Sequence, residues 1–167
     1  NMENRKYLLL DNKNRSGLSS SLKGCIKLHL IKKSEFDEWL NSSSKKLRNW
    51  INSNNFKPIS GSVLFYPNSD LKIEKIFAII DNDYSFWEIS RIKKSLPDGN
   101  YEINIQNLEK YECDFSLAWS LENYSFNPFN PKKNKKILYK NSNLLIKNKI
   151  SKLVYPQING IYLARDL

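Results

Sequence analysis

Hydrophobic and polar positions along this chain alternate first with the period of a strand and then with that of a helix. After a polar, Ser-rich beginning, residues 25–31 alternate well enough to predict a strand. Apolar residues then recur at helical spacing from Phe36 to Ile51. This spacing predicts one amphipathic helix of about four turns, with Ser34 as its N-cap.

Shorter segments continue the alternation. Residues 62–66 and 73–80 predict two strands, and the turn between them predicts that they pair antiparallel. A short amphipathic helix is expected over residues 86–92, and the strict alternation of residues 101–105 predicts a strand with one polar face.

The last third of the chain is expected to be mostly helical. A second long helix is predicted after Asn107, and residues 137–139 are the last strand candidate. From Asn143 onward we expect helix, interrupted at Pro156 because proline lacks a backbone N–H. Strands and helices alternate without internal repeats, which predicts a three-layer α/β fold with a mixed sheet flanked by helices.

The final residues have the pattern of a helix without a stop signal. Ile158 and Tyr162 are four residues apart, as are Leu163 and Leu167, and no glycine, asparagine or proline follows them. We therefore expect residues 156–167 to begin a linker helix that leads to a further domain.

The remaining residues divide into an arm and one domain. Residues 1–24 are expected to form an irregular arm or one edge strand, followed by a flexible loop at residues 19–21. Residues 25–155 are expected to form the α/β domain. A chain of 167 residues with 40% hydrophobic and 13% aromatic residues has enough apolar surface for one folded core.

Cysteine content and hydropathy exclude two protein classes. Cys25 and Cys113 are isolated from each other, so the chain is not a disulfide scaffold, and unpaired thiols favour a reducing compartment. No apolar segment reaches the length of a membrane span. A cytoplasmic protein without membrane contact is therefore expected.

The net charge of +10 raises nucleic-acid binding as an alternative, because a basic surface attracts phosphate. The charge comes from 22 lysines and 5 arginines, and recognition of phosphate and guanine favours arginine. The lysines are scattered, apart from one dense run between Lys132 and Lys136. The pattern favours a solvated surface, and a basic nucleic-acid-binding module stays the alternative.

Candidate catalytic residues are few. His29, the one histidine, lies in the middle of a predicted strand and is expected to be a half-buried structural residue. Asp81 and Asp83 could hold a cation at the carboxyl edge of the sheet, but bonding to their own turn backbone explains them better. The five glycines are isolated, which excludes the common phosphate-binding loops. An independent enzyme that uses Asp81 and Asp83 therefore ranks last among the hypotheses.

The four tryptophans lie on apolar faces of predicted helices, which favours core packing or a subunit interface over a stacking platform for bases. They are Trp39, Trp50, Trp87 and Trp119. No catalytic, cofactor-binding or metal-binding residue is predicted in this chain.

Ordered blocks of the sequence carry a resemblance to a known family. The blocks are residues 26–31 with 36–40, 85–87, 96–101, 117–126 and 162–167. Together they resemble the N-terminal domain of bacterial leucyl aminopeptidases, which are hexameric two-metal exopeptidases, over most of residues 25–167.

The resemblance implies a macro-domain-like α/β fold joined by a long helix to a C-terminal catalytic domain. Family members use two divalent ions, zinc or manganese, to activate the water that attacks the first peptide bond of a peptide substrate. Their metal ligands and catalytic residues lie in the C-terminal domain, so none is carried over to this chain, and no nucleotide ligand is inferred. The implied role is assembly: packing against the catalytic domain and against neighbouring subunits of a hexamer, and limiting access to the active site.

Overall fold

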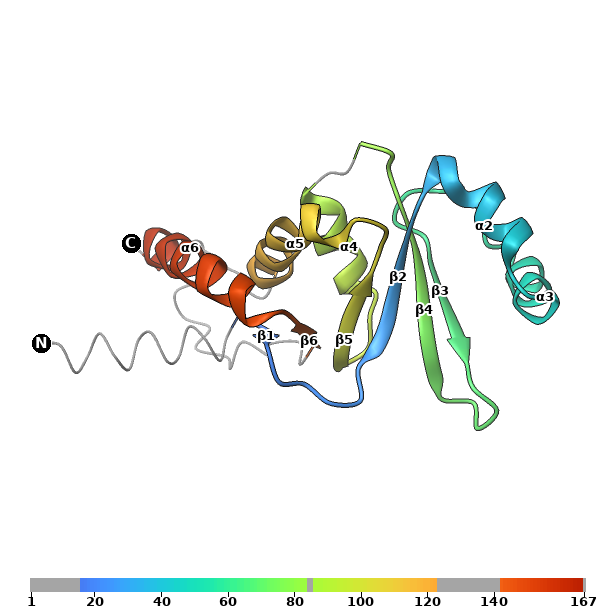
Figure 1. The fold of residues 1–167 in the computed structure, drawn as a ribbon, viewed down its shortest axis with the longest axis horizontal. Helices are drawn as coiled ribbons and strands as arrows, with labels where there is room; N and C mark the ends of the chain where they lie inside the picture. The colour runs from blue at the N-terminus through green and yellow to red at the C-terminus, as the bar shows by residue number, and fades with distance from the viewer. Residues whose placement is uncertain (1–15, 84–85, 123–141, 167) are drawn as a thin grey trace, which may run out of the picture.

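The computed structural model describes residues 16–83, 86–122 and 142–166, which form a six-stranded sheet with helices on both faces (Figure 1). The strand order is β1-β6-β5-β2-β4-β3. The strands are β1 (Leu18–Ser19), β2 (Ile26–Lys32), β3 (Val63–Pro67), β4 (Ile73–Ile80), β5 (Gly99–Asn104) and β6 (Ser142–Leu145). Between them lie η1 (Lys33–Glu35), α2 (Phe36–Ser42), α3 (Lys45–Ser53), α4 (Phe86–Lys94) and α5 (Leu108–Glu122), and α6 (Asn148–Asp166) comes last.

The pairing makes this a mixed sheet. β3 and β4 pair antiparallel, as their connecting turn predicts, and the other described pairs are parallel. The predicted three-layer α/β fold is therefore confirmed.

Strand β4 shows how the two helical layers share one sheet. Ile76, Ala78 and Ile80 are fully buried on the face covered by α4, α5 and α6 (Figure 1). Phe77 and Ile79 alternate with them and pack on the opposite face against α2 and α3. Because both faces of β4 are covered over residues 76–80, this part of the strand is an unbroken apolar run, which is typical of a buried strand in an α/β sheet.

The single long helix predicted for residues 34–51 is wrong: the segment forms two helices. Ser43 and Ser44 have extended backbones (ψ 153° and 155°) between α2 and α3. The hydroxyls of Ser42 and Ser43 donate to the Trp39 carbonyl at 3.0 and 2.7 Å, and the Ser44 hydroxyl accepts a hydrogen bond from the first turn of α3 at 3.2 Å. Serine side chains therefore replace helical hydrogen bonds and start a new helix.

The prediction for the C-terminal segment is wrong at two points. Residues 142–145 form strand β6 between β1 and β5, because pairing on both sides and burial of Leu144 outweigh the local helical pattern. Helix α6 also continues through Pro156 without the predicted interruption. Val154 and Ile158, on either side of the proline, are fully buried, and this packing offsets the lost backbone hydrogen bond.

The described part of the N-terminal arm supplies the predicted edge strand. It lies at Leu18–Ser19 and pairs with β6, so Ser19 belongs to the strand and not to the loop.

The Lys132–Lys136 run and the strand candidate at residues 137–139 lie outside the described residues. None of the described helices is both long and apolar enough to cross a membrane.

Candidate functional site

The carboxyl ends of β2, β4, β5 and β6 meet at one edge of the sheet, because these strands run parallel. From β2 the chain passes to α2 on one face, whereas from β4 and β5 it passes to α4 and α5 on the other (Figure 1). Ligands of open α/β sheets bind outside the carboxyl ends of strands where the connections diverge in this way. This edge is therefore where a site is sought first.

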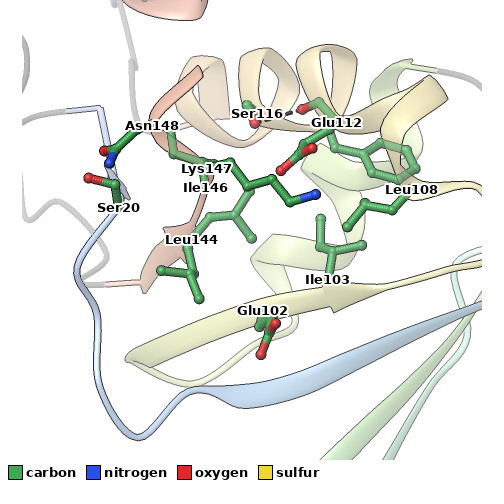
Figure 2. A pocket seen from close by; sticks show the side chains of 12 residues that line it. Ser20, Glu102, Ile103, Leu108, Glu112, Ser116, Leu144, Ile146, Lys147 and Asn148 are labelled. Carbon is green, nitrogen blue, oxygen red and sulfur yellow. Dashed lines mark hydrogen bonds between the residues drawn. The ribbon is translucent and has the colours of Figure 1, made fainter. Parts of the chain in front are cut away.

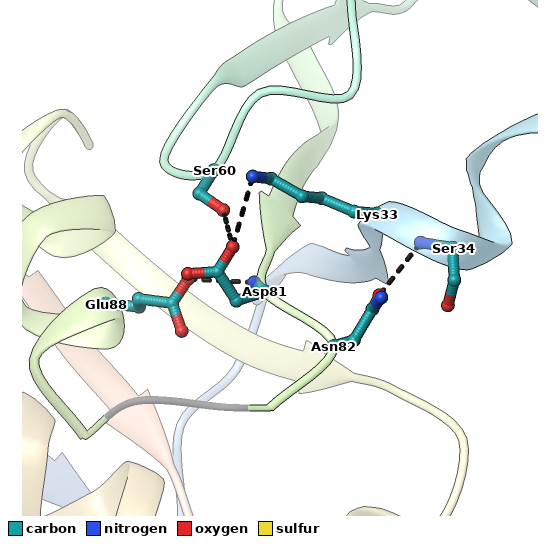
Figure 3. A network of polar contacts seen from close by, with 6 residues as sticks. All are labelled: Lys33, Ser34, Ser60, Asp81, Asn82 and Glu88. Atoms are coloured by element: carbon teal, nitrogen blue, oxygen red, sulfur yellow. Dashed lines mark hydrogen bonds and ion pairs between the residues drawn. The ribbon is translucent and has the colours of Figure 1, made fainter.

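Asp81, at the end of β4, is the centre of a polar network at this edge (Figure 3). Its Oδ1 accepts a hydrogen bond from the Ser60 hydroxyl and lies 3.2 Å from the Lys33 ammonium. Its backbone N–H donates to Glu88 Oε1 at 2.8 Å. The hydrogen bond from Ser60, together with Lys33, lowers the pKa of the Asp81 carboxyl.

The network connects elements and does not resemble a catalytic centre. It joins the end of β2, the loop before β3 and the start of α4, and Asn82 adds a 2.9 Å bond from the Ser34 backbone N–H. Among the described residues, the Asp81 carboxylate is bound by side chains of other elements and not by its own turn as predicted. Asp83 is exposed. Nowhere in the described part of the chain do three or more His, Cys, Asp or Glu residues come together as a possible metal site.

His29 lies in β2, half-buried as the sequence predicts, and stacks on Phe77 with 5.0 Å between ring centroids. Its Nε2 is buried without a hydrogen-bond partner. Burial lowers the pKa of the imidazole, and the charges of Lys75 and Lys27 lower it further. A neutral ring that fills space is the role that this geometry supports.

We expect acid to destabilise the fold through His29. The unfolded chain takes up this proton near pH 6.5, whereas the folded chain takes it up only at lower pH. Stability from this residue is therefore complete above about pH 6.5 and is lost as the pH falls through the lowered folded pKa.

Urea unfolding between pH 7.5 and 5.5 measures this loss. The matched variant His29→Phe keeps a flat ring and cannot titrate, so its free energy of unfolding should depend less on pH over this range. Equal pH dependence in both proteins would show that His29 does not carry the effect.

The tryptophans divide into three environments. Trp39 in α2 packs against other aromatic side chains of the core. Trp50 in α3 donates its indole N–H to the Phe65 carbonyl at 2.9 Å. Trp119 in α5 is fully buried. Trp87 in α4 is 58% exposed and shares the helix with exposed Arg91 and Lys94 at i+4 and i+7. Core packing thus explains three of the four tryptophans, and the α4 face of Trp87, Arg91 and Lys94 remains as a candidate contact surface.

Both cysteines are free thiols in the structure and form no disulfide. Burial raises the pKa of the Cys25 thiol, and the charge of Glu102 raises it further, which makes this thiol less reactive.

Comparison with known proteins gives a match to a family model and matches to solved structures. The family model described as M17 aminopeptidase, N-terminal domain, matches residues 26–140. The crystal structure of a cytosol aminopeptidase from Coxiella burnetii, at 1.8 Å resolution, superposes on the chain with a TM-score of 0.76 at 23% sequence identity. The comparison with curated proteins gives no significant sequence match to the chain.

The superposition has unequal coverage. It includes 90% of this chain but only 33% of the Coxiella chain, so this chain spans about a third of the length of that aminopeptidase.

Proposed function

Because the chain belongs to the family of M17 aminopeptidase N-terminal domains, we propose that it is the non-catalytic N-terminal domain of a cytoplasmic leucyl aminopeptidase. In this proposal the parent enzyme removes N-terminal amino acids from peptides. Two divalent ions, zinc or manganese, and all catalytic residues are held by a C-terminal domain. The family match over residues 26–140 is the observation that carries the proposal.

The work of this domain is assembly. We propose that it packs against the catalytic domain and against neighbouring subunits of a homo-oligomer, a hexamer, and limits access to the active site. The α4 face supports this role, because an exposed tryptophan beside an arginine is a combination enriched at protein interfaces. Helix α6, which runs to Asp166, would continue as the linker to the catalytic domain.

Introducing a charge on the α4 face should weaken the assembly. In the parent enzyme, Trp87→Glu would place a carboxylate where the indole makes contact, and sedimentation velocity should show smaller species at equal concentration. Leu71→Glu is the matched control, because Leu71 is 85% exposed but lies at the turn between β3 and β4. Unchanged assembly in Trp87→Glu, or equal loss in both variants, would contradict the assignment of the interface to α4.

The same two variants test nucleic-acid binding. One observation favours this alternative: Trp87 is exposed among basic residues, as a platform for stacking bases would be. Binding to random duplex DNA, titrated with salt, would be weak for any protein of this charge. Site-preferring binding that is lost in Trp87→Glu and kept in Leu71→Glu would instead support the nucleic-acid-binding module.

A further inference from the structure

A cavity of about 340 Å³ lies beyond the ends of β5 and β6, between α5 and the start of α6 (Figure 2). Its walls are largely apolar, and it has the size of a small-molecule site. The apolar lining residues are Ile103, Leu108, Phe115, Leu144, Leu145 and Ile146. The Asp81 network contributes no residue to this cavity.

One polar side chain, that of Glu112, is unexpected in the wall of such an apolar cavity. It lies in α5, it is only 6% exposed, and its Oε2 is buried without a hydrogen-bond partner. A buried carboxylate oxygen without a partner is costly, and a cationic donor is the partner that relieves this cost best. The cavity next to Glu112 has room for that donor.

Lys147 brings a positive charge to the same space. Figure 2 shows the Glu112 carboxylate, from α5, and the Lys147 side chain, from the start of α6, both reaching into the cavity, while the Glu102 carboxylate points to the other side of β5. The structure shows no ion pair between Glu112 and Lys147. Helix α6 begins at Asn148, also in the cavity wall, and its N-terminus favours an anion.

Two opposite charges on one small apolar cavity define the chemistry of a ligand. We propose that the cavity binds a free α-amino acid with an apolar side chain. The ligand ammonium would bind Glu112, the ligand carboxylate would bind Lys147 at the start of α6, and the side chain would pack against Leu108 and Phe115. This inference does not depend on the proposed peptidase role, and its test does not measure peptidase activity.

Three probes of one carbon skeleton test which charges the cavity recognises. Leucine carries both charges, isoamylamine lacks the carboxylate, and 4-methylpentanoate lacks the ammonium. Isothermal titration or NMR titration of the chain should show saturable binding of leucine with a Kd of about 1 mM or tighter. Each of the other two probes should bind at least about tenfold more weakly, because each loses one charge-assisted contact.

Two variants locate the site. Glu112→Gln and Lys147→Met should each weaken leucine binding about tenfold, whereas the control variants Glu109→Gln and Lys149→Met should bind as the original chain does. The control residues are exposed charges, Glu109 in α5 and Lys149 in the first turn of α6. Lys147 is exposed, so its variant keeps the test decisive even if Glu112→Gln fails to fold.

The proposal is overturned if leucine does not saturate by about 10 mM, a concentration far above the expected Kd. It is also overturned if isoamylamine binds as tightly as leucine, or if both Glu112→Gln and Lys147→Met bind leucine normally.

Discussion

Replacing Trp119 by alanine should lower the free energy of unfolding by about 3–5 kcal/mol, the cost of removing a large buried aromatic side chain. The indole is fully buried where α5 meets the sheet, and its ring lies 5.8 Å from that of Tyr101. Its N–H donates to the Ser142 carbonyl at 3.2 Å, which connects α5 to β6. The Lys93 ammonium lies 5.0 Å from the ring centre and donates to the Trp119 backbone carbonyl at 2.7 Å.

Urea unfolding at pH 7.5 measures this loss, and the melting temperature should fall by roughly 10 °C. Trp87→Ala is the matched control, because it removes the same side chain from an exposed position and should change stability by less than about 0.5 kcal/mol. If the two variants lost equal stability, Trp119 would not be the packing centre that the structure indicates.

Local signals in the sequence predict much of this fold. The turn at residues 67–70 joins two apolar segments, and β3 and β4 pair antiparallel around it as expected. The strands β2 and β5 follow from alternation alone, because burial differs between their two faces.

The errors arise where contacts distant in sequence decide the structure. Residues 142–145 have no strong strand pattern and become β6 because they lie between β5 and β1. Pro156 stays in a continuous helix because Val154 and Ile158 are buried. The break between α2 and α3 was predictable, since three consecutive serines at 42–44 offer hydrogen bonds that compete with those of a helix.

At the Asp81 network and at the Glu112 cavity, too, local sequence signals predict one part of the site and contacts distant in sequence decide the rest. Sequence identifies Asp81 as a residue at the end of a strand, but its partners Ser60 and Glu88 come together only in the fold. Glu112 has a signal in the sequence, although it was not among the predicted site residues. It lies at helical spacing between Leu108 and Phe115, so a charged residue occupies the apolar face of α5.

The second large effect concerns catalysis. We expect this chain alone to hydrolyse leucyl-p-nitroanilide at the uncatalysed rate with manganese or zinc present. The parent enzyme, which adds the proposed catalytic domain, should exceed that rate by at least about a millionfold. The reason is chemical: in the proposed mechanism two metal ions activate the attacking water, and this chain is proposed to hold neither. A chelator should abolish the activity of the parent and leave the rate with this chain unchanged.

This assay of the isolated chain tests the central claim most directly, with Asp81→Asn as the matched variant because Asp81 belongs to the last-ranked hypothesis of an independent enzyme. The account predicts background rates for both proteins, with or without manganese. Manganese-dependent turnover that a chelator removes and that Asp81→Asn reduces would contradict it, because an active site would then lie within this chain.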